Sequence, residues 1–153
     1  LFQKFYKTIY TTDCSFLLQD YIEGHNCDYK VLVYFDKIFC LKRNVRKNDF
    51  RASGSGKFES TKIPDFALKD VMEFYKILNM PIGSFDIIVD EKEKKTYFIE
   101  WQGIHHGPAT VLLTKLYCEC SNGKFLWKEN NNDIEDIFVY AYSKFILGSI
   151  NGK

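Results

Sequence analysis

The segment 84–102 constrains the fold of this chain most strongly, because it predicts a β-hairpin with two very different faces. Runs of β-forming residues at 85–89 and 96–101 flank a charged turn at 91–95. With the turn centred near Glu93, Asp86 is expected to lie opposite Glu100. One face then carries Asp86, Ile88, Phe98, Glu100 and Gln102, and the other carries Phe85, Ile87, Val89, Tyr97, Ile99 and Trp101. The second face is apolar throughout and predicts one side of a core.

Two carboxylates that face each other across a strand pair repel. A hydrated cation such as Mg²⁺ or Mn²⁺ prefers carboxylate and amide oxygens and would relieve that repulsion. The hairpin therefore predicts a metal site made of Asp86, Glu100 and Gln102. The alternative is a solvated sheet face on which the register differs by one residue.

Length and composition favour a single globular domain over residues 1–153. Apolar residues make up 46% of the 153 residues and aromatic residues 17%, enough for a packed interior. The net charge of +1 excludes a general electrostatic attraction to nucleic acid. No apolar run approaches the roughly 20 residues of a membrane span, and no signal peptide is visible.

The five cysteines are odd in number and follow no zinc-binding spacing, which favours reduced thiols and a cytoplasmic protein. Cys118-x-Cys120 is a weak metal motif whose two thiols would share a face if the segment were a strand, and ordinary buried thiols are the favoured interpretation. The chain begins without Met, directly in an amphipathic pattern, so we expect a piece of a longer protein. Whether it forms a homo-oligomer stays open.

The remaining patterns predict an α+β fold with a mostly antiparallel sheet. Strands are expected at 16–21, 28–35 and 37–45, a helix from Asp65 as N-cap to about Asn79, and a last helix at 133–147 capped by 130–132. The end of a helix is expected at 1–10, a loop at 46–62 and a turn-rich loop at 103–108. Residues 109–117 suit either a helix or a strand.

Charged residues of the second predicted strand pair fall on one face. Asp28 and Lys30 are neighbours there, the next strand adds Arg43, and Lys42 points the opposite way. In the loop that follows, a P-loop motif fails because Arg51 and Phe58 occupy its required glycine and Ser/Thr positions.

Each of the two predicted loops, at 46–62 and 103–108, allows two interpretations. The backbone amides around Ser53 and Gly54 could surround an anion beside Arg51, or the loop is simply a mobile surface segment. The adjacent His105 and His106 are candidates for contact with a substrate, or are solvated or hydrogen-bonded loop histidines.

Several short motifs, taken in order, resemble the C-terminal half of an ATP-grasp domain, the nucleotide-binding module of carboxylate–amine ligases. The resemblance covers about residues 16–108. It rests on their combined order and spacing: Gln19-Asp-Tyr-Ile-Glu-Gly24, Asp28-Tyr-Lys30, Leu41-Lys-Arg43, Asp49-Phe-Arg51 before a glycine-rich loop, Phe85-Asp86-Ile87 and Ile99-Glu100-Trp-Gln102.

The resemblance implies a role for each matching residue. The hinge that contacts adenine would be Gln19, Asp20, Tyr21 and Ile22, and Asp28 would bind the ribose hydroxyls. Lys30 stands where relatives usually carry Arg, while Arg43 and Arg51 match basic positions that contact phosphates or the acyl phosphate. Asp86, Glu100 and Gln102 match the Mg²⁺ ligands. ATP, Mg²⁺ or Mn²⁺, and small carboxylate and amine substrates are the implied partners.

The chain departs from the family pattern at three points. It has Glu-x-Gln where Glu-x-Asn is usual, and Ser53 where an Asn is usual. The N-terminal half of the module, with its lysines and its glycine-rich lid, should precede residue 1; residues 1–14 would be the end of that subdomain, and residues 109–153 a C-terminal extension.

The expected activity is therefore ATP-dependent ligation through an acyl phosphate. Two alternatives remain: a kinase-like ATP-grasp protein that phosphorylates a hydroxyl group, and a degenerate, non-catalytic domain that keeps the sheet as a scaffold.

Overall fold

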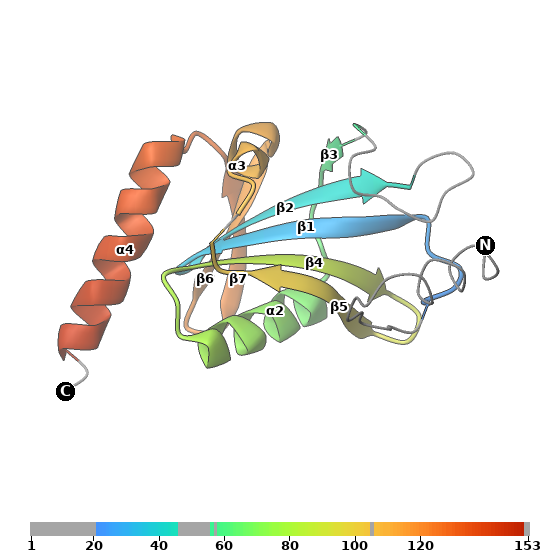
Figure 1. The fold of residues 1–153 in the computed structure, drawn as a ribbon, viewed down its shortest axis with the longest axis horizontal. Coiled ribbons are helices and arrows are strands. Elements are labelled where there is room, and N and C mark those ends of the chain that lie inside the picture. Colours follow the sequence, from blue (N-terminus) through green and yellow to red (C-terminus); the bar gives the residue numbers. More distant parts are fainter. Residues whose placement is uncertain (1–20, 46–55, 57, 105, 152–153) are drawn as a thin grey trace, which may run out of the picture.

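The chain folds into an antiparallel sheet with helices on both faces, so it belongs to the α+β class (Figure 1). The computed structural model describes residues 21–45, 56, 58–104 and 106–151. In chain order the elements are β1 (Cys27–Tyr34), β2 (Lys37–Asn44), β3 (Phe58–Ser60), α2 (Asp65–Leu78), β4 (Ile82–Asp90), β5 (Lys95–Gln102), α3 (Ala109–Leu113), β6 (Leu116–Ser121), β7 (Lys124–Glu129) and α4 (Ile134–Asn151).

The sheet has the strand order β5-β4-β1-β2-β6-β7, and β3 pairs with β2 beside β6. All six pairings are antiparallel. Three of them are hairpins between consecutive strands, and the pairings of β1 with β4 and of β2 with β6 join those hairpins. The expected strands at 28–35 and 37–45 are confirmed to within one residue at each end.

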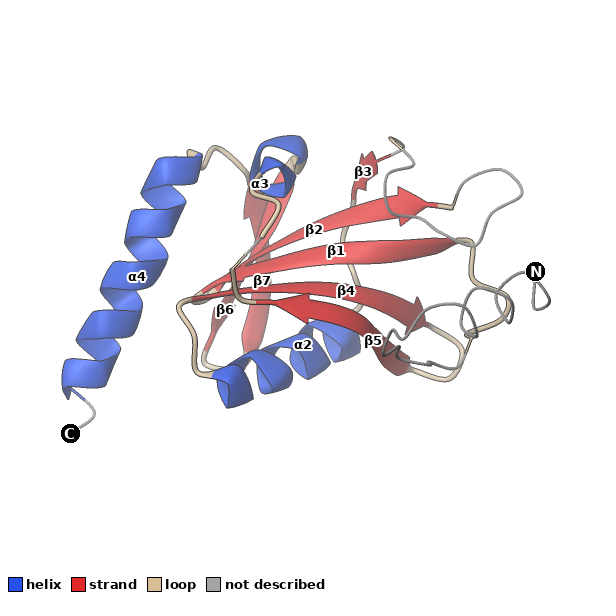
Figure 2. Cartoon of the chain, in the orientation of Figure 1, coloured by secondary structure: helices blue, strands red, loops and turns tan. Residues whose placement is uncertain are grey.

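Helix α2 packs against one face of the sheet; in Figure 2 it is the blue helix that lies along the red strands. Its buried side chains pack against alternate residues of β1, β2 and β4, which point to this face because side chains alternate along a strand. The helix contributes Ala67, Leu68, Val71, Met72 and Tyr75, and the sheet contributes Val31, Val33, Ile38, Cys40, Phe85, Ile87, Val89 and Cys118. The predicted apolar stripe of this helix is confirmed as core.

Of the elements in the described residues, α3 and α4 cover the other face of the sheet towards one end (Figure 1). Val111 of α3 and Ile137 and Ala141 of α4 pack there on a group of sheet residues, which are Leu32, Tyr34, Phe39 and Ile82. Farther along β1, the same face carries Lys30 and Asp28 in place of apolar residues. This change from apolar to charged along one face sets the position of the polar group described below.

The β4–β5 hairpin forms as expected, with one irregularity that changes which side chains share a face. Asp86 lies opposite Glu100, but Ile87 lies opposite Phe98, so Ile99 is an extra residue on β5. Phe98 therefore turns into the core beside Phe74, at a ring separation of 4.9 Å. The prediction that Phe98 shares the carboxylate face is wrong, and so is the core position predicted for Ile99, which is exposed. A bulge exchanges the two faces at the point where it occurs.

The predicted caps of the helices are corrected. Helix α2 has Pro64 rather than Asp65 at its N-cap, while its end at Leu78, before a left-handed Asn79, agrees with the expected end near Asn79. Helix α4 begins after Asp133, whose carboxylate accepts a hydrogen bond from the Glu135 amide. Asn130, expected among the caps, instead donates to the carbonyl oxygens of Val111 and Thr114.

Two regions differ from their predicted secondary structure. Residues 21 and 22 are not part of a strand, whereas a strand was expected at 16–21, and residues 1–20 lie outside the described part of the chain. The expected loop at 46–62 contains the short strand β3, and the ambiguous segment 109–117 holds both α3 and the start of β6.

The β6–β7 hairpin adds two strands that the sequence analysis did not identify. Cys118 lies on β6 and is fully buried in the α2-side core, with Cys120 packed at its margin. The four cysteines of the described residues are free thiols, as expected. No helix within the described ranges is long and apolar enough to cross a bilayer.

Candidate ligand-binding site on the sheet

Four charged residues from three adjacent strands meet on the sheet face opposite α2. Asp28 and Lys30 come from β1, Arg43 from β2 and Asp86 from β4. The strand register brings them together, because Asp28 lies directly opposite Arg43 and Lys30 lies directly opposite Asp86. We call these four residues the charged quartet.

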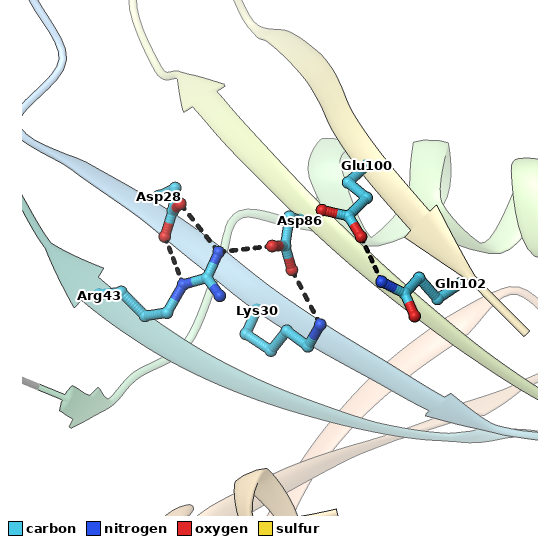
Figure 3. A network of polar contacts seen from close by, with 6 residues as sticks. All are labelled: Asp28, Lys30, Arg43, Asp86, Glu100 and Gln102. Carbon is cyan, nitrogen blue, oxygen red and sulfur yellow. Dashed lines mark hydrogen bonds and ion pairs between the residues drawn. The ribbon is translucent and has the colours of Figure 1, made fainter. Parts of the chain in front are cut away.

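The quartet forms a chain of ion pairs (Figure 3). Arg43 Nε and Nη2 donate to the two carboxylate oxygens of Asp28 at 2.6 and 2.8 Å. The same Nη2 lies 2.8 Å from Asp86 Oδ2, so the arginine reaches from β2 over β1 to β4. Lys30 Nζ lies 3.1 Å from Asp86 Oδ1. Two positive and two negative side chains therefore neutralise one another.

These charges are largely withdrawn from water. The four side chains are between 10% and 17% exposed, so solvent screens their interactions weakly. Burial raises the pKa of the Asp28 carboxyl, and the Arg43 guanidinium opposes that shift. Neighbouring Asp86 adds to the rise in the pKa of Asp28, because its negative charge disfavours a second carboxylate nearby. The quartet thus holds two carboxylates close together at an energetic cost, a feature found both in functional sites and in structural ion-pair networks.

Glu100 and Gln102 lie next to the quartet on the adjoining strand β5. Glu100 is the cross-strand partner of Asp86, as predicted. The amide Nε2 of Gln102 donates a hydrogen bond to Glu100 Oε1, and Figure 3 shows this pair separated from the four ion-paired side chains. The three predicted metal ligands therefore come from neighbouring positions, but Asp86 turns to the cations of β1 and β2 while Glu100 and Gln102 turn to each other.

Ser84 is a member of this face that the sequence analysis missed. It precedes Asp86 by two residues, so strand alternation puts it on the same face, and this was the available signal. It lies opposite Gln102 on one side and Leu32 on the other. Its side chain is 1% exposed and its hydroxyl has no hydrogen-bond partner among the described residues. A buried hydroxyl without a partner is costly, and it marks a position where a ligand atom would be favourable.

The loop after β5 returns to the quartet. A Cβ atom placed on Gly107 would lie 3.8 Å from Lys30 Cε, so the loop passes against the lysine stem. His106 is buried, with its ring 6.1 Å from that of Phe138 in α4. The loop residue Gly107 thus lies near the quartet, while His106 itself packs towards α4.

Two further predicted site residues lie in the described segment before the Gly24 turn, where Tyr21 is exposed and Ile22 is partly buried. Six predicted residues lie outside the described part of the chain: Gln19, Asp20, Arg51, Ser53, Gly54 and His105.

A divalent cation matches this face in its donor chemistry. Within the described ranges, no three His, Cys, Asp or Glu side chains gather as a metal site. Asp86 and Glu100 nevertheless supply two carboxylates across one strand pair, and Gln102 supplies an amide oxygen. Asp86 Oδ1 is buried, and its contact with Lys30 is an ion pair without an aligned hydrogen bond. This oxygen has capacity for a further ligand.

Comparison with known proteins gives no relative. No family model, no curated protein and no solved structure matches this chain. What the polar face does must therefore be inferred from its own geometry and chemistry.

Proposed function

We propose that this chain is the C-terminal half of an ATP-grasp nucleotide-binding module in an ATP- and Mg²⁺-dependent carboxylate–amine ligase. The observation that carries the proposal is the charged quartet next to Glu100, on an antiparallel sheet whose other face is closed by α2. Four of the seven residues assigned to ribose, phosphate and metal by family resemblance contact one another, although they are spread over 59 positions of the sequence, from Asp28 to Asp86.

Each residue of this face has a role in such a reaction. Asp28 would accept hydrogen bonds from ribose hydroxyls, and Lys30 and Arg43 would contact phosphate oxygens. Catalysis of phosphoryl transfer consists mainly of positioning and charge neutralisation, so no nucleophilic side chain is required. The fixed guanidinium fork of Arg43 suits the planar spread of charge on a transferred phosphoryl group.

The metal ligands would be Asp86, Glu100 and Gln102. Bound there, Mg²⁺ would offset negative charge on the phosphates. Asp86 lies on β4, and Glu100 and Gln102 lie on the paired strand β5. The rigid sheet limits how far these three side chains can move apart. Free thiols such as Cys40 and Cys118 fit a reducing compartment, and we place the protein in the cytoplasm.

One observation favours a second candidate, a non-catalytic scaffold. Asp86 already has a cation at each of its oxygens, so the quartet is electrically complete without a ligand. Buried ion-pair networks also occur for structural reasons. A scaffold of this kind would bind neither ATP nor Mg²⁺.

Titration calorimetry separates the two candidates. ATP is titrated with and without Mg²⁺ into the natural full-length protein and into the 153-residue chain, each beside the double variant Asp86→Asn/Glu100→Gln. Lys42→Met serves as a matched control, because Lys42 lies on the opposite sheet face near Glu59. We expect Mg²⁺-dependent ATP binding by the full-length protein, kept by Lys42→Met and lost by the double variant.

If neither the full-length wild type nor its double variant shows ATP binding in the titration, the ligase proposal is contradicted and the scaffold is the remaining candidate. If ATP binds, ADP release that requires both a carboxylic acid and an amine identifies the ligase reaction.

A further inference from the structure

The two cations that neutralise Asp86 are held very differently. Arg43 makes two short hydrogen bonds to Asp28 in addition to its contact with Asp86, so three strands fix it in place. Within the described part of the chain, Lys30 makes one ion pair, from the end of a flexible four-carbon stem, at 3.1 Å and without an aligned hydrogen bond. Of the two cations, Lys30 is the one that can leave Asp86 without breaking other contacts in the quartet.

The charges around Asp86 decide when a divalent cation can bind. The quartet is neutral, and Glu100 opposite Asp86 brings the total to one negative charge. A divalent cation at Asp86 and Glu100 would turn that total positive while the Lys30 ammonium is still beside a ligand oxygen. A polyphosphate supplies the missing negative charge, and it also offers the ammonium a new partner.

We propose that Lys30 is an exchangeable counter-ion of Asp86, which occupies the carboxylate when no metal is bound and moves to a nucleotide phosphate when metal and nucleotide bind together. This inference rests on the proposed ATP-grasp function and adds a thermodynamic coupling to it. The divalent cation and the nucleotide each bind weakly alone, and each strengthens the other.

The test measures binding of Mn²⁺, a paramagnetic substitute for Mg²⁺, from the loss of the free-ion signal in electron paramagnetic resonance. The natural full-length protein is titrated with and without a non-hydrolysable ATP analogue. The variants are Lys30→Met, Lys30→Gln, Lys30→Arg and Asp86→Asn, and Lys42→Met is the matched control on the opposite sheet face. Thermal unfolding of each variant verifies that it is folded.

For the wild type, Lys30→Arg and Lys42→Met, we expect the ATP analogue to strengthen Mn²⁺ binding at least about tenfold. With Lys30→Met and Lys30→Gln, Mn²⁺ alone should bind about tenfold more tightly than to the wild type, because a positive charge within a few ångströms has been removed. The strengthening by the ATP analogue should shrink accordingly. Asp86→Asn should lose Mn²⁺ binding in both conditions.

The outcomes separate this inference from the proposed function. Mn²⁺ binding that depends on the ATP analogue in the wild type, yet is unchanged in folded Lys30→Met and Lys30→Gln, would overturn the counter-ion role and leave the function standing. Failure of the wild type to bind both Mn²⁺ and the analogue would overturn the function, and the inference with it.

Discussion

Arg43 of β2 contacts one carboxylate on each of the next two strands, Asp28 of β1 at two atoms and Asp86 of β4 at one. Its guanidinium is the only group that contacts both carboxylates among the described residues. Removing it leaves two carboxylates close together, with Lys30 as their remaining cation. Breaking a buried ion pair on one side is costly because the partner keeps its charge without compensation.

Replacing Arg43 with Met should therefore lower the free energy of unfolding by about 3–5 kcal/mol. Urea denaturation followed by circular dichroism measures this change. Lys128→Met is the matched control, because Lys128 pairs with Glu119 at 2.7 Å in a more exposed setting. We expect no resolvable change there. An equally small change in the free energy of unfolding with Arg43→Met would contradict the view that the ion pairs of Arg43 stabilise the contact between three strands.

Asp90 has a different electrostatic role, at the end of β4. Its Oδ1 accepts hydrogen bonds from the amides of Glu93 and Lys92, at 3.1 and 2.9 Å. These bonds, with the Glu93 amide foremost, hold the pKa of Asp90 below its ordinary value of 3.8. A carboxyl whose pKa is lower in the folded state stabilises that state above pH 3.8, and this contribution is lost as the pH falls through the folded pKa.

Asp90→Asn keeps an oxygen that can accept the same hydrogen bonds but removes the charge. The wild type should be more stable than this variant at pH 7, and the difference should disappear towards pH 2. Urea denaturation at a series of pH values measures it. A difference that does not change with pH would show that the hydrogen-bond geometry matters here and the charge does not.

At the scale of single elements, the bulge at Ile99 reconciles two requirements of β5. Near the turn, Phe98 must point into the core beside Phe74 and Phe85. Farther along, Glu100 must lie opposite Asp86 on the other face. The extra residue is accommodated between these two positions and is exposed.

Deleting Ile99 should therefore restore regular pairing and leave both Phe98 and Glu100 on their present faces. We expect the variant to fold with a loss of stability within about 1 kcal/mol, because an exposed residue is removed. Deleting Tyr97 is the contrasting control, since it lies in the regular part of the pairing and its loss shifts the neighbouring residues to the wrong faces. Two-dimensional NMR spectra and denaturation compare the two deletions. Equal damage by both would contradict the view of Ile99 as an inserted residue.

Local sequence patterns predicted those elements whose signals are local. The alternation in β1 and β2 and the helical stripe of α2 were sufficient, because each depends on neighbours within a few positions. The β6–β7 hairpin had a clear signal that was overlooked, the Asn122-Gly123 pair, whose φ angles of 51° and 73° are typical of a tight hairpin turn. The bulge at Ile99 had no such signal, since it results from packing against α2 and from pairing with β4.

At the scale of the whole molecule, the candidate site depends on pairings between distant segments. The sequence placed Asp28, Lys30 and Arg43 on one face, and Asp86 opposite Glu100, each within a single hairpin. It did not show that Lys30 lies opposite Asp86, because that contact requires the pairing of β1 with β4. Patterns within a strand carry no information about which distant strand lies beside it.

The pairing of β1 with β4, here called the seam, also determines when the polar face can form during folding. Hairpins β1–β2 and β4–β5 close over short turns, so each can form early, whereas the seam closes a long segment that contains α2. Both ion pairs of Asp86 cross this seam, and so would any ligand held between Lys30 and Glu100. A chain in which both hairpins have formed but have not yet paired would have no complete site. The rate at which ligand binding recovers during refolding would therefore report the rate at which the two halves of the sheet come together.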